Sequence, residues 1–281
     1  MRVNTGRFAL LLALVAAHVP SALFAQSCTF DRFLVREARE ALQSSPTPGP
    51  LPANMSAISR PLSTSREASG VLIRSTSDIG SGGLLLAFPG NAQTARELAF
   101  HLASLADDGF DVYSFDYPNL LGTQPLPRLH DLVNDARALV TFYLKDPRYK
   151  DKVKVLYGVS TGGVILAQAV RGNFSSSVKL VLDSVPDRLP WLLMCDAELD
   201  PSRAVEAMTP PTNALLIING AADSKVLPAN SRALAKAAER LGGCHAVLPR
   251  GTHPYEEGDD VFGRLELIRR LSRGGQPCRA K

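Results

Sequence analysis

Residues 153–163 read VKVLYGVSTGG, and an apolar run, 164–170, follows them. The first five residues form a short, mainly apolar stretch that is typical of a buried strand, and the apolar run has the length of a short helix. Gly158 and Gly162 leave room for a sharp turn around Ser160. The pattern therefore predicts a strand, a tight turn and a helix, with the serine hydroxyl exposed at the turn.

Ser160 is a candidate nucleophile in this setting. The start of the expected helix places partial positive charge where a negative oxygen would form during attack. Because Gly-x-Ser-x-Gly also occurs by chance, the hypothesis depends on the strand before the motif and the helix after it. The alternative interpretation is a tight turn without a chemical role.

Expected strands and helices alternate on both sides of this turn. Short apolar runs predict strands at 71–74, 84–88, 112–115, 153–157, 179–182, 214–218 and 246–248. Apolar residues at helical spacing predict helices at 94–107, 129–144, 164–170 and 201–208. This order predicts an α/β fold with a mainly parallel, doubly wound sheet, which carries its site at the carboxyl ends of its strands.

A serine hydroxyl needs a positioned base at neutral pH. His253 is the candidate base, since its loop follows the last expected strand and should emerge at the same sheet edge as Ser160. The alternative is a loop histidine with a structural role. The other histidines have ordinary explanations: His18 lies in the N-terminal segment, His101 and His130 fall in expected helices, and His245 opens a strand.

A carboxylate usually orients such a base. Asp223 comes in the loop after the strand at 214–218, so it should lie at the same sheet edge. Asp183 follows the preceding strand and is the serious alternative. The remaining acidic residues nearby are expected to be solvated: Asp187, Asp196 and Asp200.

Backbone amides usually stabilise the negative oxygen formed in acyl transfer. The turn at Ser160 offers the amide of Thr161. A second donor is expected from the loop after the strand at 84–88, where Gly90 permits a tight turn and the Asn91 amide can face the serine. The same loop is also compatible with an ordinary turn capped by Thr94.

From about Gly70 to its carboxyl end, the chain resembles the α/β-hydrolase superfamily. The resemblance rests on five segments: 88–91, 116–123, the turn at Ser160, the Asp223 loop and the His253 loop. The order Ser, Asp, His is the order that this fold uses. Many relatives have His-Gly where this chain has Pro89-Gly90, and Arg-Gly where it has residues 118–121, so no close subfamily is assigned.

The resemblance implies a serine hydrolase that transfers an acyl group to water through an acyl-serine intermediate, with no metal and no cofactor. The expected substrate is a carboxylic ester; a thioesterase, peptidase or acyltransferase would use the same three side chains. A non-catalytic binding protein that kept the fold is the alternative of another class.

Relatives insert a cap over the active site where this chain has residues 185–213. If the segment is a cap, Trp191, Leu192 and Met194 would offer an apolar wall for a small-molecule acyl substrate. A plain connecting helix is the alternative interpretation of the same residues.

Residues 1–25 are expected to be a signal peptide, with a positive start, an apolar stretch at 8–17 and small residues before cleavage after Ala25. The apolar stretch is shorter than the roughly 20 residues that span a bilayer. We therefore expect a periplasmic or secreted protein without a stable membrane anchor. A lipid anchor on Cys28 is the weaker alternative.

The chain has 281 residues, of which 45% are hydrophobic, enough for one catalytic domain, expected at 70–281 after a helix and a Pro/Ser-rich segment at 26–69. Cleavage of the signal peptide would remove Arg2 and Arg7, so that 29 of the 31 basic residues remain, compared with 27 acidic residues. The sequence has no run of basic residues that would indicate nucleic-acid binding.

Four cysteines in an exported chain favour disulfides. Of the three possible pairings, the favoured one joins Cys195 to Cys244 and Cys28 to Cys278.

Overall fold

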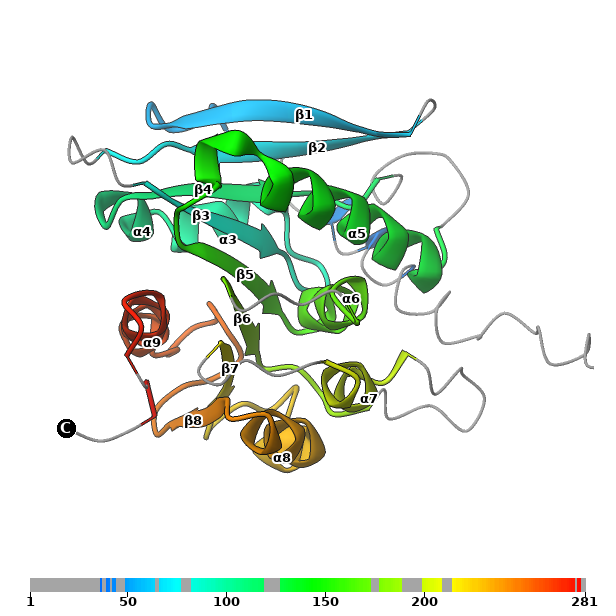
Figure 1. The fold of residues 1–281 in the computed structure, drawn as a ribbon, viewed down its shortest axis with the longest axis vertical. Helices are drawn as coiled ribbons and strands as arrows, with labels where there is room; N and C mark the ends of the chain where they lie inside the picture. Colours follow the sequence, from blue (N-terminus) through cyan, green and yellow to red (C-terminus); the bar gives the residue numbers. More distant parts are fainter. Residues whose placement is uncertain are drawn as a thin grey trace, which may run out of the picture.

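A computed structural model describes residues 36, 39–40, 42–43, 49–63, 66–76, 82–118, 127–172, 177–188, 199–208, 214–275 and 277–278. Within these residues, the chain forms one eight-stranded sheet with the order β1-β2-β4-β3-β5-β6-β7-β8 (Figure 1). The strands are β1 Met55–Ser63, β2 Arg66–Ile73, β3 Gly83–Phe88, β4 Phe110–Phe115, β5 Lys154–Val159, β6 Val178–Asp183, β7 Leu215–Gly220 and β8 Cys244–Leu248. β1, β2 and β4 pair antiparallel, and all later pairs are parallel.

Helices cover both faces of the sheet (Figure 1). One face packs against α3 Ala95–His101, α4 Ser104–Asp107 and α9 Val261–Ser272. The other packs against α5 Leu129–Lys145, α6 Thr161–Ala169, α7 Pro201–Glu206 and α8 Arg232–Arg240. The described residues also include the short 3-10 helices η2 Pro147–Tyr149 and η4 Pro228–Ser231. This is the α/β-hydrolase fold that the sequence predicts.

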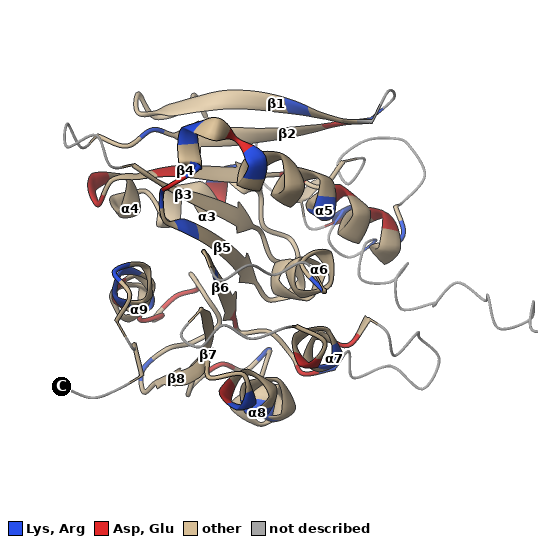
Figure 2. Ribbon diagram, in the orientation of Figure 1, with Lys and Arg blue, Asp and Glu red and all other residues tan. Residues whose placement is uncertain are grey.

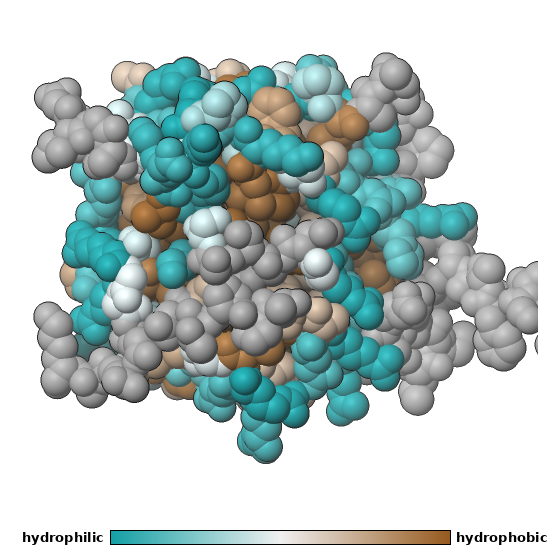
Figure 3. All heavy atoms as spheres, viewed as in Figure 1, coloured by the Kyte–Doolittle hydropathy of each residue, from teal (hydrophilic) through white to brown (hydrophobic). Residues whose placement is uncertain are grey.

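The central strands are buried on both faces, which explains their apolar runs. In β3, Leu84 and Leu86 pack into the core under α5–α8, whereas Leu85 and Ala87 pack under α3, α4 and α9. The ribbon coloured by charge shows residues of both signs along α5 and α8, while the central strands carry few charged residues (Figure 2). On the face seen in Figure 3, several apolar patches lie between hydrophilic side chains of the described residues.

The expected start of the domain near Gly70 is too late. β1 and β2 pair with each other, and β2 pairs with β4, so residues 55–73 belong to the same sheet. The Pro/Ser-rich segment, which includes Pro61, was expected to be extended but to lie outside the domain; β1 is an edge strand, where a proline is tolerated. The helix expected at 94–107 is also wrong as one element, because it divides into α3 and α4.

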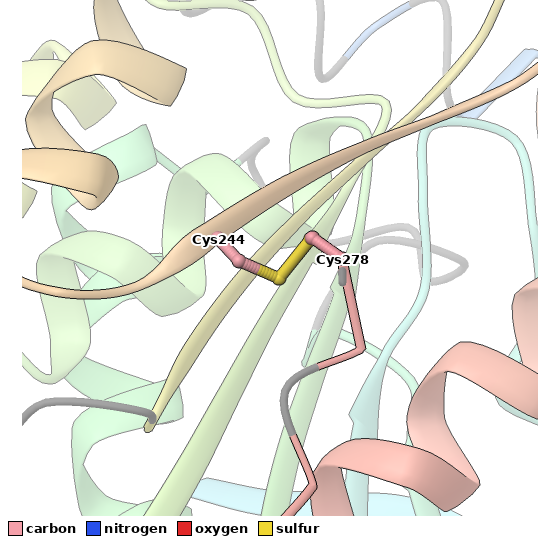
Figure 4. Close-up of a disulfide and its surroundings, with 2 residues drawn as sticks. All are labelled: Cys244 and Cys278. Atoms are coloured by element: carbon pink, nitrogen blue, oxygen red, sulfur yellow. A yellow bond between two sulfur atoms is a disulfide. The ribbon is translucent and has the colours of Figure 1, made fainter. Parts of the chain in front are cut away.

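The favoured disulfide pairing is wrong for the two cysteines that the structure describes. Cys244 at the start of β8 is bonded to Cys278, which follows α9, with 5.9 Å between their Cα atoms (Figure 4). Sequence spacing does not reveal this pair, since it depends on where the chain runs after α9. Cys28 and Cys195 lie outside the described residues.

Several expectations fall on residues that the structure does not describe. These are the signal peptide at 1–25, most of the helix expected at the start of the segment 26–69, and the proposed cap wall of Trp191, Leu192 and Met194. Among the helices that are described, none has the length and hydrophobicity to cross a membrane.

Candidate active site

Ser160 stands at the turn between β5 and α6, as the sequence predicts. Its φ of 49° and ψ of −120° form a left-handed turn that is strained for a residue with a side chain. The Ser160 amide donates to the Asp183 carbonyl at 2.9 Å, which fixes the turn to the end of β6. The hydroxyl does not cap α6 and the residue is partly exposed, so it is available for chemistry.

Two glycines at the start of α6 allow this turn to pack tightly. A Cβ on Gly162 would lie 2.2 Å from the Phe88 carbonyl oxygen and 2.3 Å from the Pro89 carbonyl oxygen. A Cβ on Gly163 would lie 2.1 Å from a methyl group of Val185. The first turn of α6 therefore rests directly on the backbone at the end of β3, where no side chain fits.

We expect Gly162→Ala to lower the free energy of unfolding by about 3 kcal/mol, the upper end of the cost of overpacking, because the clashing atoms are backbone carbonyls. Gly49→Ala is the control, since its Cβ would meet nothing within 4 Å. Chemical denaturation of both variants measures the difference. Equal stability of the two variants would show that the packing at the turn is looser than described.

His253 and Asp223 form a hydrogen-bonded pair. The Nδ1 atom of His253 lies 3.0 Å from Oδ2 and 3.2 Å from Oδ1 of Asp223. The Asp223 side chain is fully buried, and the His253 side chain is 12% exposed. The Lys225 and Val226 amides also donate to Asp223 Oδ1, each at 2.9 Å.

The charge of Asp223 determines the tautomer of His253. Burial alone would raise the pKa of Asp223, but the hydrogen bonds from His253 and from the Val226 amide outweigh it, and the pKa is lowered. An ionised carboxylate only accepts hydrogen bonds, so Nδ1 of His253 must carry the proton. In the neutral ring, Nε2 is then the acceptor, which is the form that a base requires.

Ser160, Asp223 and His253 each follow the carboxyl end of a strand in the parallel part of the sheet. Ser160 follows β5, Asp223 follows β7 and His253 follows β8, with β6 between β5 and β7. Strand-end hydrogen bonds join these ends: the Ser184 amide donates to the Ile218 carbonyl at 2.8 Å, and the Ala221 amide to the Leu248 carbonyl at 2.9 Å. In the part described, Ser160 makes no side-chain hydrogen bond to His253; such bonds often tighten only when substrate is bound.

Asp183, the alternative carboxylate, has other partners. Its Oδ1 accepts a hydrogen bond from Arg264 Nη1, and its Oδ2 accepts one from the Tyr157 hydroxyl at 2.7 Å. All of its side chain is buried. The structure therefore places Asp223, and not Asp183, in hydrogen-bond contact with the His253 ring.

The turn after β3 approaches Ser160. A Cβ on Gly90 would lie 3.5 Å from the Cβ of Ser160. The Gly90 amide donates to the side chain of Gln93 at 3.1 Å, but within the described residues the Asn91 amide donates to no acceptor. The Thr161 amide opens α6, where helical amides have no partner within the helix. Both amides proposed as oxyanion donors are therefore free to bind a ligand.

Tyr117 fixes this turn and was not expected from the sequence. Its hydroxyl donates to the Pro89 carbonyl oxygen at 3.0 Å. Burial raises the pKa of Tyr117 far above the ordinary value, so the hydroxyl keeps its proton and donates at neutral pH. The one signal in the sequence for this role is the position of Tyr117 just after β4.

Other residues near the His253 loop were also missed. Arg264, Asp259, Tyr157 and Tyr255 form a buried polar network below it. One signal was present in the sequence: Arg264 lies on the apolar stripe of α9, at helical spacing from Leu267, Ile268 and Leu271, which are all buried.

The other described histidines have surroundings that give them no part in the candidate site. His101 stacks on Tyr255 and His245 lies 3.0 Å from the Asn219 side chain, while His130 is exposed on α5.

A surface cavity of about 330 Å³ lies beside α8 and His245, and none of the three candidate catalytic residues, Ser160, Asp223 and His253, lines it. The described residues contain no group of three or more His, Cys, Asp or Glu that could hold a metal ion.

The family model described as the alpha/beta hydrolase family matches residues 84–250, which is more than half of the chain. An esterase domain from Rhodothermus marinus is similar in structure, with 20% identity and a TM-score of 0.58 over 78% of this chain and 98% of that one. A thermophilic esterase from Thermogutta terrifontis, solved with propionate bound, has 16% identity and a TM-score of 0.59 over 82% and 97%. A dienelactone hydrolase from Anabaena variabilis has 16% identity and a TM-score of 0.58 over 79% and 99%. No curated protein matches the chain in sequence.

Proposed function

The chain belongs to the alpha/beta hydrolase family, and we propose that this hydrolase cleaves carboxylic esters with Ser160 as nucleophile, His253 as base and Asp223 as the group that orients the base. One observation carries the proposal above all others. The Nδ1 atom of His253 lies 3.0 Å from the buried Asp223 carboxylate, so that in the neutral ring Nε2 is the nitrogen that can accept the serine proton.

The first half of the reaction forms the acyl-serine intermediate. Ser160 Oγ attacks the ester carbonyl carbon while its proton passes to His253 Nε2. The carbonyl oxygen becomes negative and accepts hydrogen bonds from the Asn91 and Thr161 amides. Collapse of the tetrahedral intermediate breaks the bond to the alcohol, which leaves with the proton from His253.

The second half returns the enzyme to its starting state. Water attacks the acyl carbon as His253 Nε2 takes one of its protons, and the same amides bind the negative oxygen again. The bond to Ser160 Oγ then breaks, Ser160 recovers its proton, and the carboxylic acid is released. Asp223 stays ionised throughout and stabilises the imidazolium form of His253 in both halves.

Esters are the first choice among acyl substrates, because two of the structurally similar proteins are described as esterases. Thioesterase, peptidase and acyltransferase activities remain alternatives that use the same chemistry. The proposed substrate is a small molecule, and neither metal nor cofactor takes part in the proposed steps.

A fluorophosphonate probe tests the proposal, since it reacts only with an activated serine. We expect the folded wild-type protein to be labelled at Ser160, identified by peptide mass, and to hydrolyse p-nitrophenyl esters. A series of acyl chain lengths, with matched thioesters and anilides, then identifies the substrate class. Absence of labelling in folded wild-type protein would favour a binding protein that kept the fold.

We also propose that the protein is exported, as a periplasmic or secreted enzyme cleaved after Ala25, because of the composition of residues 1–25. Disulfides persist in such compartments. The Cys244–Cys278 bond agrees with this proposal.

A thiol count is expected to find no free cysteine in the denatured, unreduced protein and four after reduction. The bond between Cys244 and Cys278 spans 34 residues, a loop whose closure stabilises the fold by about 3–4 kcal/mol in the chain-entropy model. Four free thiols before reduction would contradict the prediction and weaken the case for export.

A further inference from the structure

Arg264 has a fully buried guanidinium group that binds three separate parts of the chain. Its Nε and Nη2 atoms donate to the Asp259 carboxylate at 2.8 and 2.9 Å. Nη1 donates to Asp183, at the end of β6, and Nη2 also donates to the Thr252 carbonyl oxygen at 2.7 Å. Asp183, Asp259 and Arg264 all have side chains with no exposed surface.

These contacts hold the backbone on both sides of His253. On the amino side, Arg264 binds the carbonyl of Thr252. On the carboxyl side, Asp259, which Arg264 holds, accepts from the Tyr255 amide at 2.9 Å. The loop therefore has two fixed points, one residue before His253 and two residues after it.

The loop needs such support because it has no regular structure of its own. Residues 249–260 form turns and bends, and Tyr255 and Gly258 have φ values of 67° and 79°. A non-glycine residue with positive φ is strained and persists only where its surroundings enforce it. The Arg264 network supplies that enforcement at Tyr255.

Two tyrosines extend the network to β5, the strand that ends at Ser160. The Tyr157 hydroxyl donates its one proton to Asp183, so Tyr255 must be the donor in the 2.6 Å hydrogen bond between the two hydroxyls. The Tyr255 ring also stacks on His101, with ring centres 4.5 Å apart. The His253 loop is thus connected to the same strand that carries the nucleophile.

We propose that Arg264 is a positioning residue that fixes the backbone of His253, while Asp223 fixes its ring. The inference rests on the proposed function. It assigns a role to Asp183 as well: this carboxylate anchors Arg264 and does not orient the base. Apolar side chains in place of the whole buried cluster could fill the same space at little cost in stability, but they could not bind the Thr252 carbonyl.

The effect on catalysis depends on the position of the His253 Nε2 atom. It accepts the Ser160 proton in acylation and activates water in deacylation, so both steps slow when the loop shifts. A misplacement of about 1 Å can lower a rate by about 100-fold. Substrate binding does not depend on Nε2, so KM should change little.

The test compares two arginines of α9, each bound to a carboxylate. Arg264→Lys keeps the charge but loses the forked contacts with Asp259 and the Thr252 carbonyl. Arg269→Lys is the matched control, because Arg269 binds Asp108 and Ser104 and does not contact the His253 loop. We expect a loss in kcat of about 10- to 100-fold for Arg264→Lys, with KM within about twofold of wild type, and no change for Arg269→Lys.

A spectroscopic readout separates positioning from general destabilisation. The downfield NMR signal of the His253 Nδ1 proton, assigned by its loss in His253→Gln, should broaden or disappear in Arg264→Lys at temperatures well below unfolding. Arg269→Lys should retain it. Wild-type kcat and an unchanged signal in a folded Arg264→Lys protein would overturn the inference.

Asp259→Asn provides a second variant of nearly native shape, which decides the matter if Arg264→Lys does not fold. It should lower kcat about 10-fold, again with little change in KM, and full activity would overturn the inference. Wild-type protein that reacts with no fluorophosphonate refutes the proposed function instead. Labelled, active wild type together with fully active variants refutes only the role of Arg264.

Discussion

Ser160→Ala is expected to lower kcat for ester hydrolysis by about 10⁶-fold, the scale seen when a triad serine is removed. No acyl-enzyme can form without the Ser160 oxygen, and the remaining groups support only slow direct attack by water. Fluorophosphonate labelling should disappear together with the activity. The fold should survive, because alanine is smaller than serine and its Cβ can occupy the same place in the turn.

Ser114→Ala is the matched control for this variant. Ser114 is a buried serine in β4 whose hydroxyl has no hydrogen-bond partner within the described residues. Its removal should leave hydrolysis and labelling unchanged. Residual activity above about one hundredth of wild type in Ser160→Ala would show that another residue is the nucleophile.

The layered fold could be predicted because its central elements follow simple patterns. Strands β3 to β7 are short apolar runs buried on both faces, and each expected strand overlaps the observed one. The edge was harder to predict. β1 carries polar residues and Pro61, and its pairing with β2 is determined by the tertiary fold, not by local propensity.

The candidate site could be predicted in part, from the rule that sites lie at the carboxyl ends of the strands in a parallel sheet. Ser160, Asp223 and His253 all follow strands, and the hydrogen bond between Asp223 and His253 agrees with that reasoning. The same rule could not separate Asp223 from Asp183, which also follows a strand. The distinction comes from Arg264, which lies 81 residues from Asp183 in sequence and neutralises that carboxylate from another element.

The supporting residues could not be predicted for the same reason. Tyr117 contacts the Pro89 carbonyl across 28 residues, and Tyr157 contacts Tyr255 across 98. When only the sequence is known, Tyr157 is an ordinary core residue of a strand, and Tyr117 and Tyr255 are ordinary loop residues. Their hydroxyl partners become visible only when the strands, loops and α9 are assembled.

Asp223→Asn is expected to lower kcat by about 10⁴-fold while the fold stays intact. The asparagine amide can donate to Nδ1 of His253, which favours the tautomer with the proton on Nε2. That tautomer cannot accept the Ser160 proton, and no carboxylate remains to stabilise the imidazolium form. The loss should therefore appear in kcat and in the rate of fluorophosphonate labelling, with KM little changed.

Asp183→Asn provides the decisive comparison, because the sequence alone leaves both carboxylates as candidates. The variant removes a charge that binds Arg264 and Tyr157, not His253. We expect a loss in kcat of no more than about 100-fold, through a shift of the His253 loop, together with a lower melting temperature. The reverse order, with Asp183→Asn more impaired in kcat than Asp223→Asn, would mean that Asp183 orients the base during turnover and that the Asp223–His253 hydrogen bond belongs to a resting arrangement.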